Sequence, residues 1–174
     1  IISPADDVEA KAAVKAAYAY DGPVYLRFGR LAVPVFHSED YKFEIGKGTV
    51  VKEGKDVTII ATGVCVDSAV KAAALLAEDG IDAEIINICT IKPLDEDLII
   101  KSAKKTGKVV TAEEHSVIGG LGSAVCDCLS EKAPTPVMKI GVNDVFGESG
   151  PAGELIKKYG FDGQSIYEKV KASL

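Results

Sequence analysis

Apolar and polar residues follow one another in blocks that predict an alternation of strands and helices. Short apolar runs between turn residues predict strands, and longer stretches with apolar side chains three or four positions apart predict helices. We expect strands at residues 24–28, 48–52, 57–61, 83–88, 109–112 and 136–140. We expect helices at residues 8–20, 66–78, 96–105, 121–131, from Pro151 onward, and at 164–172.

From residue 45 onward the expected order is β-β-α-β-α-β-α-β-α-α. This order is typical of a mostly parallel sheet that is covered by helices on both faces. Residues 48–52 and 57–61 are joined by a short polar turn, so we expect these two strands to form a hairpin. The sequence therefore predicts an α/β fold of three layers, α/β/α, whose sheet has about five strands including one antiparallel strand.

Several helix starts carry recognisable signals. Asp6 and Asp7 lie where the helix of residues 8–20 begins, and acidic residues are stabilising in a first turn. Asp95 is placed to be the N-cap of the helix that follows it. In the helix of residues 66–78 we expect one apolar face, formed by Val70, Ala73, Ala74 and Ala77.

The composition indicates a filled core and argues against some classes of partner. Of the 174 residues, 47% are hydrophobic and 26% are charged. The formal net charge of −6 disfavours a nucleic acid or an anionic membrane as partner, because both require a basic face. The four cysteines follow no metal-site spacing, and three lie in apolar runs, which favours reduced thiols in a cytoplasmic protein. These cysteines are Cys65, Cys89, Cys126 and Cys128.

The first 30 residues look incomplete on their own. The chain does not begin with methionine, and its first residues resemble the end of an element. One helix and one strand cannot bury their apolar faces alone, so they must belong to a sheet that is completed elsewhere. We therefore interpret the chain as part of a longer polypeptide.

Residues 113–122 (EEHSVIGGLG) form the first candidate site, where a strand should give way to a helix. In open parallel sheets, ligands bind near such crossovers. Its glycines either make a tight turn that lets the helix approach the strand, or form an anion cradle at the helix N-terminus. His115 is either a hydrogen-bonded loop residue or a general base. We retain as a possible partner or anion surface Glu114, His115, Gly119 and Gly120.

Two pairs of charged residues also have alternative interpretations. Glu113 and Glu114 are adjacent, so on a strand they point to opposite faces, which favours salt-bridged or partner-facing acids over a catalytic pair. Arg27 and Arg30 flank Gly29 at the end of the first expected strand. They suit bidentate binding of a phosphate or carboxylate, or an interdomain salt bridge, and the spacing does not choose between the two.

Four motifs in this chain resemble those of the thiamine-diphosphate enzymes of the transketolase group. They occur in the order and at the spacing of that group, and the resemblance runs nearly end to end. It is closest to the separately encoded C-terminal half of split transketolases, and next to 1-deoxyxylulose-5-phosphate synthase. The motifs are residues 22–30 (GPVYLRFGR), 45–48 (IGKG), 91–95 (IKPLD) and 113–122.

The resemblance implies a division of the chain and two substrate-binding residues. Residues 1–30 would be the tail of a pyrimidine-binding domain, residues 31–44 a linker, and residues 45–174 the C-terminal domain. Arg30 matches an arginine that holds the phosphate end of the substrate in this group, and Arg27 matches less consistently.

The resemblance also implies an activity that this chain does not perform alone. The group transfers a two-carbon ketol unit between sugar phosphates with thiamine diphosphate and Mg²⁺. The residues that bind these cofactors belong to other parts of the family, so we expect no cofactor, no metal and no catalytic residue in this chain. It would support a homodimer together with the remaining transketolase domains or subunit.

Three alternatives remain open from the sequence. Two are the same portion of a 1-deoxyxylulose-5-phosphate synthase or of a 2-oxo-acid dehydrogenase β subunit. The third is a stand-alone interaction domain that binds an anion at the glycine turn.

Overall fold

The computed structural model describes residues 1–30 and 32–174, so Leu31, the first residue of the predicted linker, lies outside the described part. From β1 onward, the order of strands and helices agrees with the prediction. The elements are α1 (Asp7–Ala19), β1 (Thr49–Lys52), β2 (Val57–Ala61), α2 (Cys65–Glu78), β3 (Ala83–Asn87), α3 (Glu96–Thr106), β4 (Val109–Ser116), α4 (Leu121–Lys132), β5 (Val137–Val142), α5 (Ala152–Tyr159) and α6 (Gly163–Ser173).

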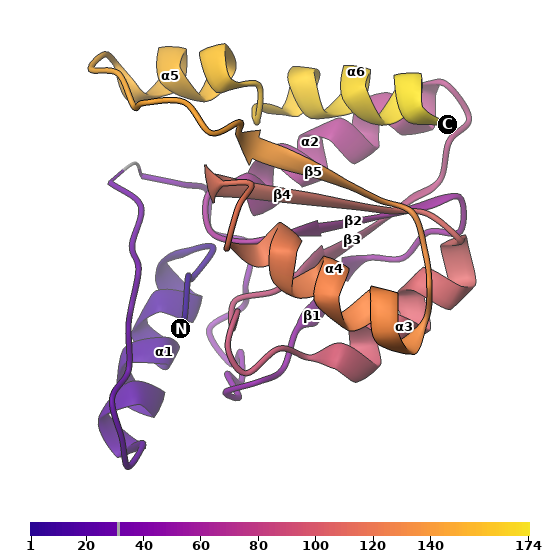
Figure 1. Ribbon diagram of the computed structural model, residues 1–174. Helices are drawn as coiled ribbons and strands as arrows, with labels where there is room; N and C mark the ends of the chain where they lie inside the picture. The colour runs from indigo at the N-terminus through magenta and orange to yellow at the C-terminus, as the bar shows by residue number, and fades with distance from the viewer. Residues whose placement is uncertain (31) are drawn as a thin grey trace.

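Within the described residues, five strands form one sheet in the order β1-β3-β2-β4-β5. β1 is antiparallel to β3, and the other neighbouring strands are parallel. α2 and α6 cover one face, and α3 and α4 cover the other (Figure 1). The predicted three-layer α/β/α fold with one antiparallel strand is therefore confirmed.

The predicted hairpin between β1 and β2 is wrong, because β3 lies between these two strands. The turn after β1 crosses the beginning of β3, where the amides of Lys55 and Asp56 donate to the carbonyl of Asp82 at 2.9 and 3.0 Å. Gly54 makes this crossing possible, since a β-carbon there would lie 2.3 Å from the main chain of Ala83. A short turn in the sequence thus joins two strands that are not neighbours.

We expect Gly54→Ala to destabilise the chain by about 1–3 kcal/mol, because its β-carbon would overlap main-chain atoms that cannot move without shifting β3. The measurement is the midpoint of urea unfolding. Gly147→Ala is the matched control, since a β-carbon added at that glycine would meet no atom within 4 Å. Equal midpoints for the two variants would contradict the close crossing of this turn over β3.

The buried face of α2 also differs from the prediction. Val70 is 38% exposed, and Ala74 and Ala77 are not buried either, whereas Ala73 is buried. α2 is rich in apolar residues around its circumference, so periodicity alone gives little contrast between faces. Packing between the sheet and α6 selects the buried set, which is Cys65, Val66, Ala69, Ala72, Ala73 and Leu76.

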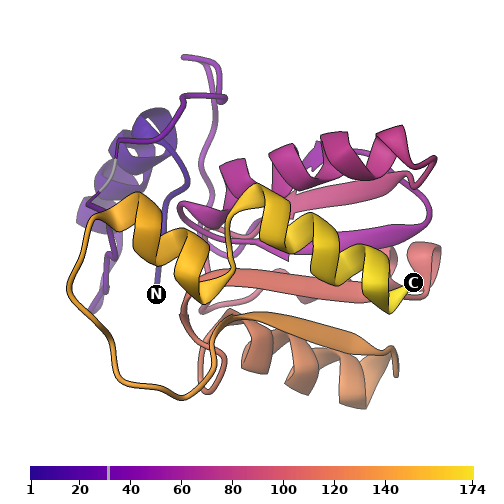
Figure 2. The ribbon, with the colours of Figure 1, turned by 90° about the horizontal axis from the view of Figure 1, so that it is seen from above.

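The first 30 residues lie beside the carboxyl ends of the parallel strands, with α1 outside the three layers (Figures 1 and 2). The predicted strand at residues 24–28 is wrong, because this segment forms an isolated bridge between Leu26 and Ile2. Ile2 also bridges to Thr90, just after β3. Because residues 24–28 pair with Ile2 alone, no second residue is available to extend the bridge into a strand.

Candidate functional site

The candidate site is the edge of the sheet where β2, β3 and β4 end and where the beginning of the chain is attached. The amide of Ser3 donates to the carbonyl of Cys89 at 2.8 Å. The hydroxyl of Thr62 donates to the carbonyl of Ser3 at 3.2 Å. These bonds fix the segment before α1 against the ends of β2 and β3, so residues from both parts of the chain meet here.

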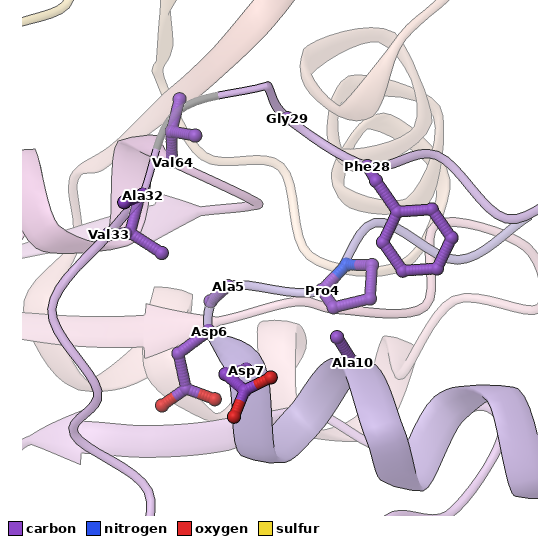
Figure 3. A pocket seen from close by; sticks show the side chains of 10 residues that line it. All are labelled: Pro4, Ala5, Asp6, Asp7, Ala10, Phe28, Gly29, Ala32, Val33 and Val64. Carbon is purple, nitrogen blue, oxygen red and sulfur yellow. The ribbon is translucent and has the colours of Figure 1, made fainter.

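A cavity of about 270 Å³ lies between this segment and the residues that precede and follow Arg30 (Figure 3). Figure 3 shows mainly apolar side chains around it, with the carboxylates of Asp6 and Asp7 at one side. Its lining contains two acids and, among the described residues, no cation, so the cavity by itself does not suit a phosphate. The lining residues are Pro4, Ala5, Asp6, Asp7, Ala10, Phe28, Gly29, Ala32, Val33 and Val64.

Asp6 joins α1 to the predicted linker. Its carboxylate caps α1 by accepting from the amide of Glu9 at 2.9 Å. It also accepts from the amides of Phe36 and His37 at 3.0 and 2.9 Å, and the imidazole Nδ1 of His37 lies 3.0 Å away. Burial raises the pKa of Asp6, but these hydrogen bonds outweigh it and hold the pKa below its usual value.

Glu9 is a fully buried carboxylate that sequence reasoning missed. It accepts from the amide of Ala5 at 2.8 Å, the hydroxyl of Tyr41 at 2.9 Å and the side-chain amide of Asn87 at 2.9 Å. Burial raises the pKa of the Tyr41 hydroxyl and of the neighbouring Cys89 thiol above their usual ranges. Glu9 therefore ties α1, the predicted linker and β3 together.

The two arginines are in different environments. The Nη2 of Arg27 donates to the main-chain carbonyl of Glu114 and lies 3.8 Å from its carboxylate. Arg30 is exposed, and within the described residues it makes no ion pair. The salt bridge that the sequence left as an alternative therefore exists at Arg27, and substrate binding by both arginines stays a prediction.

The glycine turn is a close junction between β4 and α4. Glu113 is 1% exposed, and its carboxylate accepts from the amides of Leu121 and Gly122, each at 2.8 Å. A β-carbon on Gly120 would lie 2.0 Å from the Glu113 Oε2 atom. These contacts agree with the tight-turn interpretation, and an external anion would have to compete with Glu113 for the two amides.

Of the residues predicted as a partner or anion surface, the structure brings His115 beside Gly120, where a β-carbon would lie 2.9 Å from the His115 Nδ1 atom, and it places Glu114 against Arg27 instead. β4 runs to Ser116, so Glu113, Glu114 and His115 lie on the strand itself. The His115 side chain is 46% exposed, with its Nδ1 atom 2.9 Å from the carbonyl of Ser116 and 3.9 Å from Glu113 Oε2. Gly119 lies beyond, at a positive φ of 76°. The side chains of Glu113 and Glu114 point to opposite faces of β4, as expected for adjacent residues on a strand, so they contact different groups.

These residues do not fit a thiamine diphosphate or Mg²⁺ site. Among the described residues, no group of three or more His, Cys, Asp or Glu side chains could hold a metal ion. The amides that most resemble a phosphate cradle already bind Glu113.

The four cysteines are free thiols, and burial raises the pKa of the Cys65 thiol. No helix in the described part of the chain is long and apolar enough to span a membrane.

Comparison with known proteins places the chain among transketolase-related sequences. The family model described as "Transketolase, C-terminal domain" matches residues 46–166. The chain is 46% identical to the 6-deoxy-6-sulfo-D-fructose transketolase subunit of Clostridium sp. (strain MSTE9), over 95% of this chain and 52% of that protein. It is 39% identical to 1-deoxy-D-xylulose-5-phosphate synthase 1 of Geobacter sulfurreducens, over 100% of this chain and 28% of that protein.

A solved structure extends the likeness to three dimensions. It is described as "Split gene transketolase, inactive beta4 tetramer" and matches with a TM-score of 0.94 and 51% identity. The match covers 98% of this chain and 56% of that one. The chain thus spans about half the length of the transketolase relatives that it matches.

Proposed function

This chain belongs to the transketolase C-terminal domain family, and we propose on that premise that it is the carboxyl-terminal part of an enzyme that transfers a two-carbon ketol unit between sugar phosphates. Residues 1–30 form the tail of the pyrimidine-binding domain, residues 31–44 the linker, and residues 45–174 the C-terminal domain. The observation that carries the proposal is the match to transketolase subunits along nearly the whole chain.

The chain contributes positioning and assembly to the complete enzyme. Arg30, exposed at the carboxyl edge of the sheet, binds the substrate's phosphate through its guanidinium and so orients the sugar carbonyl. Thiamine diphosphate and Mg²⁺ are held by the rest of the enzyme, which supplies the reactive carbanion chemistry. The chain alone is inactive, supports a dimer of the complete enzyme, and has free thiols that suit the cytoplasm.

The same portion of a 1-deoxyxylulose-5-phosphate synthase is the second candidate. It is supported by the 39% identity to such a synthase, which extends over the whole chain. The two enzymes differ in their ketol or acyl donor, so substrate choice separates them: a transketolase uses a ketose phosphate, and the synthase uses pyruvate.

We expect ketol transfer when the purified chain is combined with the polypeptide that completes it, thiamine diphosphate and Mg²⁺. The measurement is turnover of ribose 5-phosphate with a ketose phosphate donor, compared with turnover of pyruvate with glyceraldehyde 3-phosphate. The control is the 174-residue chain alone with the same cofactors, which should show no turnover. Turnover of pyruvate would favour the synthase instead, and activity or tight cofactor binding by the chain alone would refute its dependence on a partner.

A further inference from the structure

The segment that carries Arg30 is attached to the rest of the chain by its earlier residues. The amide of Ile2 donates to the carbonyl of Tyr25 at 2.9 Å, and the amide of Arg27 donates to the carbonyl of Ile2 at 2.8 Å. Within residues 1–30 and 32–174, no backbone hydrogen bond holds residues 28–30. The position of Arg30 must therefore depend on side-chain and packing contacts made by its neighbours.

The first such contact joins Arg27 to Glu114. The Arg27 guanidinium donates to the main-chain carbonyl of Glu114 and lies 3.8 Å from its carboxylate. Glu114 itself has a well-determined position, because the adjacent Glu113 is buried and bound to two amides of α4. Both side chains of the pair are partly buried, which reduces the screening of their attraction by solvent.

The second contact is the close approach of Gly29 to Val64, the residue just before α2. A β-carbon at Gly29 would lie 2.8 Å from Val64 Cγ1 and 3.9 Å from the Glu114 Oε2 atom. The backbone at residue 29 thus runs directly over Val64 and beside the Glu114 carboxylate, and Val64 also lines the cavity in Figure 3. Glu114 takes part in both contacts, and Arg30 is the residue directly after Gly29 in the sequence.

We propose that Glu114 is a positioning residue for Arg30. Its main-chain carbonyl accepts from the Arg27 guanidinium, and its carboxylate lies near that guanidinium and near Gly29. Together these contacts fix residues 27–30 on the C-terminal domain and so determine where the exposed guanidinium of Arg30 meets a substrate phosphate. The effect of this role on the substrate rests on the proposed function. Through it, the C-terminal domain influences substrate specificity. The domain then acts on the substrate through the arginine segment without contacting it.

The first test compares phosphorylated and unphosphorylated acceptors in the assembled enzyme. With the ketose phosphate donor at saturating concentration, we expect Glu114→Gln to raise KM for ribose 5-phosphate roughly three- to tenfold, with kcat within about twofold, and to leave KM for glycolaldehyde unchanged. Glu154→Gln, at an exposed position of α5, is the matched control and should leave all constants unchanged. An equal effect on both acceptors would overturn the proposal, because a general loss of structure does not depend on the phosphate.

A double mutant separates action through Arg30 from an independent effect. In an Arg30→Ala background, Glu114→Gln should cause no further rise in KM, since the residue that it positions is gone. Additive effects of the two substitutions on KM would refute this role for Glu114.

The second test uses the 174-residue chain and needs no activity. We expect the ¹⁵N order parameters of the Gly29 and Arg30 amides to fall from about 0.85 toward 0.6 in Glu114→Gln, and to be unchanged in Glu154→Gln. Glu114→Gln keeps the main-chain carbonyl that accepts from Arg27, so the variant tests the carboxylate, and unchanged order parameters would refute a positioning role for that group. If the wild-type assembly transferred no ketol units, the proposed function would fail instead, and the order parameters would still decide whether Glu114 holds the segment.

Discussion

Replacing Arg30 by alanine in the assembled enzyme is expected to lower kcat/KM for phosphorylated sugars by about 2–4 kcal/mol of transition-state stabilisation. This corresponds to a decrease of roughly 30- to 900-fold. The physical reason is that a guanidinium binds a phosphate through two parallel hydrogen bonds with opposite charge, and alanine supplies neither. The measurement is steady-state kinetics with ribose 5-phosphate, in which the loss should appear mainly in KM.

Two further variants show whether the loss comes from the phosphate contact. Arg30→Lys keeps the charge but not the planar fork, so we expect an intermediate loss. Lys157→Ala removes an exposed cation on α5 and should leave kcat/KM unchanged. An Arg30→Ala enzyme with wild-type kcat/KM would remove Arg30 from the substrate site.

Replacing Glu113 by alanine is expected to lower the free energy of unfolding of the chain by about 2–5 kcal/mol. The substitution leaves the buried amides of Leu121 and Gly122 without their acceptor and removes a negative charge from the N-terminus of α4. Glu113→Gln should cost less, because the side-chain carbonyl still accepts from one of the two amides. The measurement is urea unfolding followed by circular dichroism.

The control for this substitution is Glu131→Ala, at an exposed position near the other end of α4, which should change stability by less than about 0.5 kcal/mol. A Glu113→Ala chain as stable as wild type would show that water or a solute anion replaces the carboxylate. Calorimetry with phosphate distinguishes these outcomes, since an anion that takes the place of Glu113 must bind the variant in a saturable manner.

The residues at the end of β4 show which features of the candidate site could be predicted from the sequence. Adjacency on a strand correctly separated Glu113 from Glu114, and the salt-bridge alternative exists between Glu114 and Arg27. The sequence did not show that Glu113 occupies the amides of the glycine turn, because its carboxylate and those amides are eight and nine residues apart. The position of Arg30 relative to a substrate came from the resemblance and stays a prediction.

The sequence by itself determined the features that depend on neighbours a few residues apart. The order of strands and helices from β1 onward, the N-cap at Asp95, and the α/β class all follow from local periodicity and capping. The motifs also identified the transketolase group, which the comparisons confirm.

Only the tertiary structure decided which distant segments pair and which faces are buried. β1 pairs with β3 because Gly54 lets the turn pass over the start of β3, a contact between residues about 30 positions apart. α2 is apolar on most sides, so its packing against the sheet and α6, and not its periodicity, selects the buried face. Glu9 is buried because Ala5, Tyr41 and Asn87 converge on its carboxylate from three parts of the chain, and no local pattern encodes that convergence.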